Sequence, residues 1–226
     1  MDGNGRWAKR KNSPRIYGHQ SAVRVVRQIV EISAKLEIDT LTLYAFSTEN
    51  WSRPEEEVHF LMKLLEEYIK KELTTLAKNN IRLRLLGNRN RLPEFLTEPL
   101  EVALRETKDK TGMRLCIALD YGSRDEIVQA CRKIAQKAVG KGLQVADITE
   151  ALFSDHLFTR GMDDPDLIIR TSGELRLSNF LLWQAAYAEF YFTETLWPDF
   201  DGKEYYRALA DFSKRKRRKG KVYDDK

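Results

Sequence analysis

Short apolar runs alternate with amphipathic helical patterns along this chain, and no other feature of the sequence constrains the fold as strongly. Runs typical of buried strands occupy residues 41–46, 81–86, 113–119, 167–170 and 190–192. Apolar residues spaced by three and four predict helices over 20–36, 54–78, 92–109, 124–138, 179–188 and 202–218. Strands separated by helices form parallel sheets covered on both faces. We therefore predict one α/β domain over residues 1–226, with a central, mainly parallel sheet flanked by helices.

The basic residues are unevenly distributed, which bears on the partners of the protein. The net charge is +5, and Lys and Arg gather within residues 6–15 and 214–221. Such clusters suit nucleic acid, an anionic membrane surface or a phosphorylated small molecule, and composition does not choose among them. No apolar run approaches the roughly 18–20 residues that span a bilayer, and no signal peptide opens the chain. Because Cys116 and Cys131 form neither a disulfide framework nor a metal pattern, we expect a reducing, cytoplasmic location.

The opening of the chain has the residue types of an anion-binding loop. Gly3 and Gly5 flank Asn4, so the backbone can approach an anion closely, and Arg6 supplies positive charge. Asp2 offers a hard oxygen ligand of the kind that magnesium prefers. The same residues also fit a simple glycine turn with solvated basic neighbours.

Two further loops with similar chemistry follow predicted strands. Residues 47–53 follow the strand 41–46, and residues 170–179 follow the strand 167–170. Arg15 and His19 lie near the start of the first long helix, where the helix dipole favours anions. Glu189 lies in an apolar segment and is either a paired structural carboxylate or a second magnesium ligand. Ligands of parallel sheets bind at the carboxyl ends of the strands, so these loops together indicate a site for phosphate or diphosphate.

Several long motifs resemble the cis-prenyltransferase family, whose bacterial members make undecaprenyl diphosphate. In chain order they are DGNGRW at 2–7, RxxGH at 15–19, YAFSTENWSRP at 44–54, DYGSRDEI at 120–127, RTSGELRLSNFLLWQ at 170–184, AYAEFYF at 186–192 and LWPDF at 196–200. The resemblance covers nearly the whole chain and implies a parallel sheet flanked by helices. It also implies a Mg²⁺-dependent enzyme that condenses isopentenyl diphosphate with an allylic diphosphate, such as farnesyl or geranylgeranyl diphosphate, to a Z-polyprenyl diphosphate.

The resemblance further implies roles for individual residues. Asp2 would be the catalytic aspartate that binds magnesium and assists loss of the allylic diphosphate, and Glu189 would be the other metal ligand. Asn50 would orient the reacting carbons, because a neutral amide is a poor base. The residues implied to hold the allylic diphosphate are Gly3, Asn4, Gly5, Arg6, Trp7, Arg15 and His19. The residues implied in a loop over the substrates are Ser47, Thr48, Glu49, Trp51 and Arg53, and those implied for isopentenyl diphosphate are Arg170, Arg176, Leu177 and Ser178.

An apolar product needs a dry tunnel, which by resemblance would be walled by the helices 20–36 and 54–78 with the sheet as its floor. Ala45 is small where a bulky side chain would restrict this tunnel, which favours a medium or long product. We also expect a homodimer, in which the partner adds residues 218–220 (Arg-Lys-Gly). The basic segment 214–226 suits contact with an anionic membrane. Only Tyr223 accompanies its charges, so we expect no nucleic-acid partner.

The start of the chain departs from the family pattern, because family members carry a strand directly before DGNGRW and here Met1 precedes Asp2. We expect that this first strand is missing through truncation or a misplaced start. Two alternative functions remain. A non-catalytic partner subunit of the same family would be expected to lose the charged site residues, which are all present here. A phosphatase would release inorganic phosphate without needing isopentenyl diphosphate.

Overall fold

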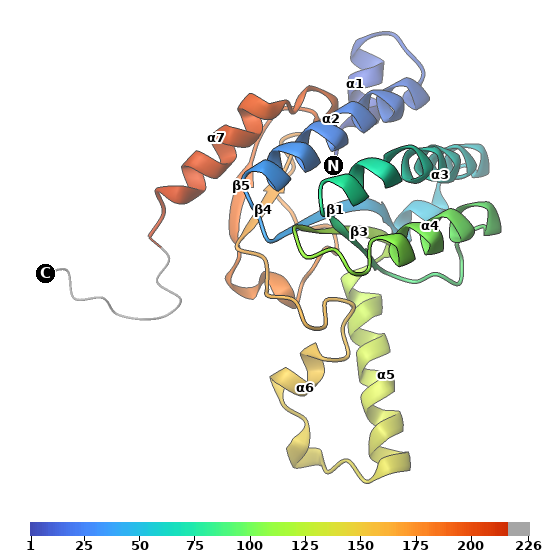
Figure 1. Cartoon of the computed structure of the whole chain (residues 1–226), viewed down its shortest axis with the longest axis vertical. Coiled ribbons are helices and arrows are strands. Elements are labelled where there is room, and N and C mark those ends of the chain that lie inside the picture. Colours follow the sequence, from blue (N-terminus) through green and yellow to red (C-terminus); the bar gives the residue numbers. More distant parts are fainter. Residues whose placement is uncertain (217–226) are drawn as a thin grey trace, which may run out of the picture.

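The computed structural model describes residues 1–216, and its strands and helices alternate as the sequence predicts (Figure 1). The strands are β1 (Thr40–Ser47), β2 (Arg82–Leu86), β3 (Arg114–Tyr121), β4 (Leu167–Arg170) and β5 (Glu189–Phe192). The α-helices are α1 (Asn4–Arg10), α2 (Arg15–Lys35), α3 (Glu55–Lys78), α4 (Glu94–Glu106), α5 (Ser123–Lys141), α6 (Glu150–Ser154) and α7 (Gly202–Ser213). Short 3₁₀ helices are η1 (Thr48–Ser52), η2 (Val145–Asp147), η3 (Gln184–Tyr187) and η4 (Trp197–Asp199).

All strand pairs are parallel, which confirms the predicted α/β class. The described strands form two sheets, one with the order β1-β3-β2 and one that pairs β4 with β5. Because β1 and β4 each have only one strand neighbour among the described residues, both are edge strands. The carboxyl ends of β1 and β4 carry the loops 47–53 and 170–179, which places two of the predicted site loops at strand ends.

The core forms around β3, whose residues Leu115–Tyr121 are all buried because strands lie on both sides and side chains cover both faces. On one face, apolar residues of α3 and α4 pack against Leu115, Ile117 and Leu119. On the other face, Cys116 and Ala118 pack against the segments around Met162 and Leu181. α2 is held between this core and α7, through contacts of Val25 and Ile29 with the cluster of Trp197, Phe200 and Tyr205.

Several helix boundaries differ from the sequence prediction, and one predicted helix does not form. α2 begins at Arg15 instead of residue 20, and α7 ends at Ser213 within the described residues. Residues 179–188 form turns and the short η3 helix instead of an α-helix. The physical reason is the backbone of Asn179 and Leu181, whose φ angles of 61° and 48° are incompatible with a right-handed helix.

The opening glycine loop is more ordered than a simple turn. Gly3 has a left-handed φ of 94°, and the chain enters α1 directly after it. α1 then packs closely on α2, because a Cβ on Gly18 would lie 2.0 Å from the carbonyl oxygen of Asn4. The absence of a side chain at Gly18 therefore sets the distance between the opening loop and α2.

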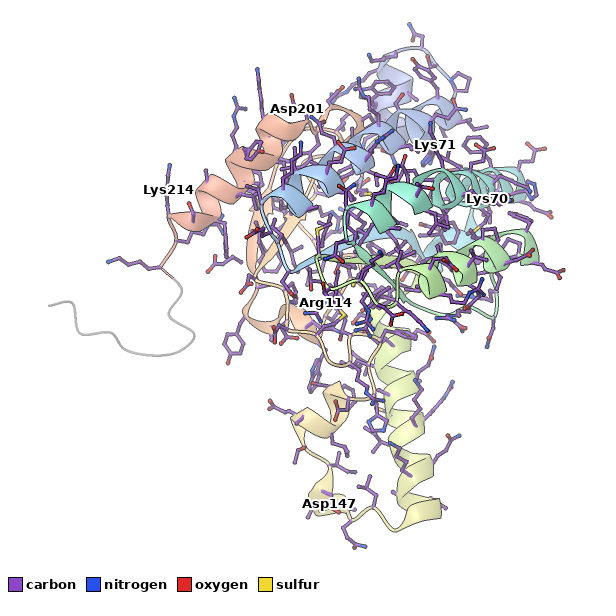
Figure 2. The ribbon with its side chains drawn as sticks, in the orientation of Figure 1. Lys70, Lys71, Arg114, Asp147, Asp201 and Lys214 are labelled. Carbon is purple, nitrogen blue, oxygen red and sulfur yellow. The ribbon has the colours of Figure 1, made fainter. Side chains whose placement is uncertain are left out.

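α5 and α6 form an arm that projects from the body, with Asp147 near its far end (Figures 1 and 2). The far end of this arm lies away from β1 and β4 (Figure 1), whereas its base contacts the loop 170–179, because the amides of Ser123 and Arg124 donate to Asn179, both at 2.8 Å. Among the residues that the structure describes, no helix has both the length and the apolar character needed to cross a membrane.

Candidate active site

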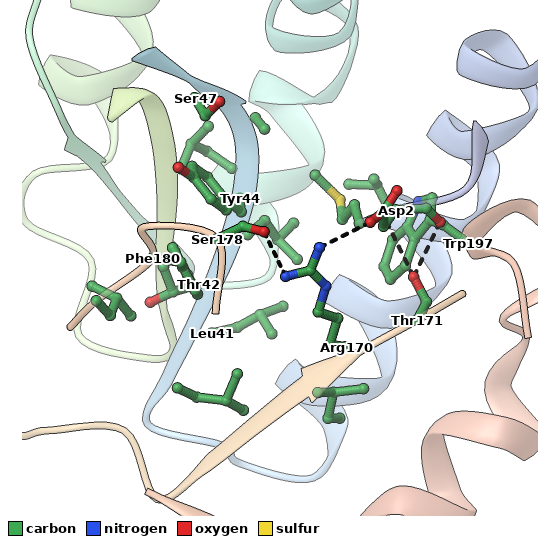
Figure 3. Close-up of a pocket in the computed structure, with 18 of the residues that line it drawn as sticks. Asp2, Leu41, Thr42, Tyr44, Ser47, Arg170, Thr171, Ser178, Phe180 and Trp197 are labelled. Carbon is green, nitrogen blue, oxygen red and sulfur yellow. Dashed lines mark hydrogen bonds and ion pairs between the residues drawn. The ribbon is translucent and has the colours of Figure 1, made fainter. Parts of the chain in front are cut away.

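A cavity of about 1260 Å³ lies among α2, α3, β1 and β4, and most of the predicted site residues line it. Figure 3 shows part of its wall, where the labelled residues include Asp2, Arg170 and Ser178. The predicted residues on its wall are Asp2, Gly3, Asn4, Gly5, Arg6, Arg15, His19, Ser47, Glu49, Asn50, Arg53, Arg170, Arg176, Leu177 and Ser178. The remaining wall includes apolar side chains of three elements, among them Val26 of α2, Ala45 of β1 and Leu61 of α3. One cavity thus joins a polar region to an apolar one.

The backbone of Asp2 is anchored at the end of β4, while its carboxylate is left partly exposed. The Asp2 carbonyl oxygen accepts hydrogen bonds from Thr171 Oγ1 at 3.1 Å, Ser172 Oγ at 2.7 Å and the Trp197 amide at 2.9 Å. Burial opposes ionisation of the carboxyl, but hydrogen bonds from Arg170 and the Gly3 amide outweigh it, so the pKa of Asp2 lies below its ordinary value. The site therefore presents an ionised carboxylate at neutral pH.

Arg170 connects Asp2 to the loop 170–179 (Figure 3). One terminal nitrogen lies 3.1 Å from Asp2 Oδ2, and the other donates to Ser178 Oγ at 2.8 Å and to the carbonyl oxygen of Arg176. Only 15% of the Arg170 side chain is exposed. A guanidinium that is held in place on several sides is well suited to bidentate recognition of phosphate oxygens.

A second group of charges surrounds Glu57, a residue that the sequence analysis did not single out. Its Oε1 lies 3.1 Å from Arg53, 3.3 Å from Arg15 and 3.8 Å from His19 Nε2. Glu57 thereby brings the basic residues of α1–α2 and of the segment before α3 to one side of the cavity. The signal in the sequence was ambiguous, because acidic residues in the first turn of α3 also suit the helix dipole.

His19 is held as a neutral ring with a free donor. Asn4 Nδ2 lies 3.4 Å from His19 Nδ1, which assigns the acceptor role to Nδ1 and the proton to Nε2. Burial and the nearby Arg53 lower the pKa of His19 from 6.5 to about 4. His19 Nε2 is buried and has no hydrogen-bond partner among the described residues, so it can donate to an anion in the cavity.

The low pKa of His19 predicts a pH-dependent stability. The unfolded chain binds a proton at His19 near pH 6.5, whereas the folded chain resists it until about pH 4, so the free energy of unfolding falls as the pH drops through this window. At 1.36 kcal/mol per pKa unit, the effect amounts to about 3 kcal/mol at most. Urea unfolding of wild type and His19→Gln, at about pH 7 and about pH 4.5, measures it. Equal losses in both proteins would contradict the assignment.

The η1 segment places two polar side chains on the cavity wall. Asn50 Oδ1 accepts a hydrogen bond from the Ser47 amide at 3.1 Å, and Glu49 Oε1 accepts one from Asn179 Nδ2 at 2.8 Å. Glu49 and Asn50 both line the cavity. The Glu49–Asn179 bond therefore joins the loop after β1 to the loop after β4.

Comparison with known proteins places this arrangement of residues in a family. The family model described as "Putative undecaprenyl diphosphate synthase" matches residues 1–220. The chain belongs to this cis-prenyltransferase family. The isoprenyl transferase of Bacillus subtilis is 48% identical over 222 residues, which cover 98% of this chain and 85% of the relative. The isoprenyl transferase of Clostridium perfringens is also 48% identical, over 98% of this chain and 88% of the relative.

Solved structures support the same assignment. Lavandulyl diphosphate synthase from Lavandula x intermedia, in complex with dimethylallyl diphosphate, superposes with a TM-score of 0.94 at 38% identity, covering 96% of this chain and 94% of that one. A probable undecaprenyl diphosphate synthase from Campylobacter jejuni has a TM-score of 0.78 at 36% identity, covering 89% of this chain and 92% of that one. The present chain is accordingly a cis-prenyltransferase with a single α/β domain.

Three residues predicted to bind substrate do not line the cavity of this cis-prenyltransferase. The indole nitrogens of Trp7 and Trp51 donate to Asp199 and Asp120, each at 2.7 Å, and the Thr48 hydroxyl donates to Glu49 at 3.2 Å. Tertiary hydrogen bonds thus hold both tryptophans in the surrounding structure, and a contact of these three residues with substrate stays a prediction.

Glu189, the other predicted metal ligand, has a basic partner in this chain, and its role toward magnesium stays a prediction. It is the first residue of β5 and lies opposite Leu167, three residues before Arg170 along β4. Since a strand rises about 3.3 Å per residue, the backbone positions of Leu167 and Arg170 along β4 lie roughly 10 Å apart. Glu189 Oε2 forms an ion pair with Arg215 at 3.0 Å. The described contacts therefore correspond to the paired-carboxylate alternative.

The donor set around Asp2 is compatible with magnesium bound together with a substrate. No group of three or more His, Cys, Asp or Glu residues within 1–216 could hold a metal ion by itself. Magnesium commonly binds through one or two carboxylates and completes its coordination with water and substrate phosphates. Asp2 supplies such a carboxylate, ionised and partly exposed on the cavity wall.

Proposed function

We propose that this cis-prenyltransferase condenses isopentenyl diphosphate with farnesyl or geranylgeranyl diphosphate and extends it to a Z-polyprenyl diphosphate such as undecaprenyl diphosphate. The observation that carries the proposal is the single cavity in which an arginine-rich region continues into an apolar one. The positive charge of the arginine-rich region suits diphosphates. The apolar region suits a hydrocarbon chain, because the chain's apolar surface is removed from contact with water there.

Each diphosphate would bind to a different set of residues. The allylic diphosphate is proposed to lie against the backbone of Gly3–Gly5, with Arg6, Arg15 and the Nε2–H of His19 as donors. Isopentenyl diphosphate is proposed to lie at Arg170, Arg176, Leu177 and Ser178. Ser47, Glu49, Asn50 and Arg53 would then face both substrates from the loop after β1.

The proposed chemistry starts with cleavage of the allylic C–O bond. Mg²⁺, held by Asp2 and substrate phosphate oxygens, would offset the charge of the departing diphosphate when bound. Arg6 and Arg15 stabilise the same charge as the electron pair moves onto oxygen. Asn50 positions isopentenyl diphosphate so that its double bond attacks the allylic carbon and forms the new C–C bond, and transfer of a proton to water or to a diphosphate oxygen then sets the cis double bond.

The apolar part of the cavity is the proposed tunnel for the product. Its walls would be α2 and α3, with Val26, Ile29, Leu61 and Leu65 on the cavity surface and β1 as the floor. Ala45 leaves the floor open, which favours a medium or long product. Leu61 and Leu65 also pack against the hydrophobic core, so these residues of α3 contact both the core and the cavity.

Assembly and location remain proposals from the sequence. A homodimer, a cytoplasmic location and a peripheral membrane contact through the basic segment are all consistent with the family. The matched residues 218–220 and most of the basic segment lie outside the described residues. Nucleic acid is not a proposed partner.

The test is incorporation of labelled isopentenyl diphosphate into butanol-extractable product, with farnesyl or geranylgeranyl diphosphate as primer. We expect incorporation that requires magnesium and stops when a chelator is added, and chromatography of the product gives its length. Release of inorganic phosphate without isopentenyl diphosphate would indicate the phosphatase alternative. No incorporation with any allylic primer would overturn the proposal.

A further inference from the structure

A fully buried carboxylate lies beside the active site without lining it. Asp120 is near the end of β3, its side chain is 0% exposed, and its φ of 48° places the backbone in the left-handed region. Burying a carboxylate is unfavourable unless charged or polar partners compensate. The partners of Asp120 therefore indicate why this position holds a charge.

Those partners are two side chains from different loops. Arg91 Nε donates to Asp120 Oδ2 at 3.0 Å, and a terminal nitrogen of the same guanidinium donates to Oδ1. The indole Nε1–H of Trp51 donates to Oδ1 at 2.7 Å. The guanidinium carbon of Arg91 also lies 5.5 Å from the Trp51 ring centroid, and Phe46 contacts the ring edge-on at 5.1 Å. Trp51 is thus fixed by its nitrogen, its face and its edge.

Fixing Trp51 has a consequence for the cavity because Trp51 belongs to η1. A 3₁₀ turn of five residues has poor internal hydrogen bonds and needs external contacts to hold its shape. Its side chains divide, since Glu49 and Asn50 line the cavity and Trp51 points to Asp120. Asn179 anchors η1 on the cavity side through Glu49, and Asp120 anchors it on the opposite side.

We propose that Asp120, held by Arg91, is a positioning residue for prenyl transfer, which orients Glu49 and Asn50 through its hydrogen bond to Trp51. This inference rests on the proposed function of the cavity. A purely structural role for Asp120 would instead stabilise the domain without affecting turnover of the folded enzyme.

The test is a double-mutant cycle in kcat with Asp120→Asn and Trp51→Phe. The first change removes the negative charge and so weakens the hydrogen bond, and the second keeps an aromatic ring and removes the donor. We expect each single variant to lower kcat about tenfold and the double variant to lose no more than the worse single one. Losses that multiply, or folded variants with wild-type kcat, would overturn the inference.

Trp183→Phe is the matched control, because the Trp183 indole also donates a hydrogen bond, to Ser154 Oγ at 3.0 Å, and Trp183 does not line the cavity. Its kcat should stay within about twofold of wild type, as expected for a contact remote from the site. If Asp120→Asn does not fold, Arg91→Lys replaces it, since lysine keeps the charge and loses the two-point contact. A several-fold loss of kcat at unchanged thermal stability is expected for Arg91→Lys, and unchanged kcat overturns the inference.

A spectroscopic measurement separates this inference from the proposed function. In ¹⁵N-tryptophan-labelled protein, the indole resonance of Trp51 is the one that disappears in Trp51→Phe. We expect its proton shift to move upfield in Asp120→Asn, as the bond to a carboxylate is lost. An unchanged shift would overturn the inference even in an active enzyme. A wild-type protein without prenyl transfer would contradict the proposed function, while the shift still reports whether Asp120 holds Trp51.

Discussion

Asp2→Asn is expected to lower kcat for prenyl transfer by at least about 100-fold, the scale of losing one preorganised electrostatic group at a reacting centre. The carboxylate is kept ionised by Arg170 and the Gly3 amide, and a neutral amide cannot supply the same anionic oxygen. The fold should survive, because Thr171, Ser172 and Trp197 hold the backbone carbonyl of Asp2 and not its side chain. Steady-state incorporation of labelled isopentenyl diphosphate and a thermal melt measure the two effects.

Asp39→Asn provides the control for this change within the same cavity. Asp39 also lines the cavity, but it is exposed, accepts from Thr40 Oγ1 at 2.8 Å and pairs with Arg114 at 2.6 Å. Exposed ion pairs contribute little, so kcat should stay within about twofold of wild type. Similar losses in both variants, or an Asp2→Asn enzyme with wild-type kcat, would contradict the role of Asp2.

Arg170→Lys is expected to raise KM for isopentenyl diphosphate by about tenfold or more and to lower kcat as well. Lysine cannot contact Asp2, Ser178 and the carbonyl of Arg176 at once, so the loop 170–179 loses its link to the carboxylate. Hydrogen bonds to charged groups contribute about 1.5–3 kcal/mol each, which corresponds to at least a tenfold effect for one lost bond. KM should be measured for each substrate separately, because the site for the allylic diphosphate should change less.

Arg84→Lys is the matched control for the arginine change. The Arg84 guanidinium also donates from both terminal nitrogens, to the carbonyl oxygen of Arg160 at 3.3 and 3.4 Å, but the residue does not line the cavity. Both kinetic constants should remain those of the wild type. An equal rise of KM in the two variants would mean that arginine loss acts through stability and not through the site.

The sequence was sufficient for elements whose pattern is local. β1, β2, β3 and α3 lie where apolar periodicity predicts them, because each buries a stripe or run of its own residues. The helix prediction for residues 179–188 was wrong, and the reason is also physical. Tertiary contacts bury Leu181 against β3, while Leu182 and Tyr187 of the same segment are exposed, so no amphipathic helix is needed there.

The N-terminus of α3 also shows that tertiary contacts can override a local sequence pattern. Ser52 and Glu55 have the spacing of a capping box, yet the Ser52 hydroxyl donates to the carbonyl oxygen of Glu49, and Pro54 is the residue that precedes the helix. The capping box forms one turn earlier, between Ser47 and Asn50. Residues 47–50 and residues 52–55 both have the spacing of a capping box, so the local sequence does not choose between them. The hydrogen bond from Trp51 to Asp120 favours a compact turn in front of the helix.

By itself, the sequence determined the parallel α/β class, the family and a set of site residues of which most lie on the cavity wall, because motifs and periodicity are properties of neighbouring residues. Only the tertiary structure decided which polar groups meet: Glu57 with Arg15, Asn179 with Glu49, and Asp120 with Trp51. It also paired Glu189 with Arg215. These contacts join residues far apart in the sequence, and the order of residues along the chain does not tell which distant residues lie close together in the folded protein.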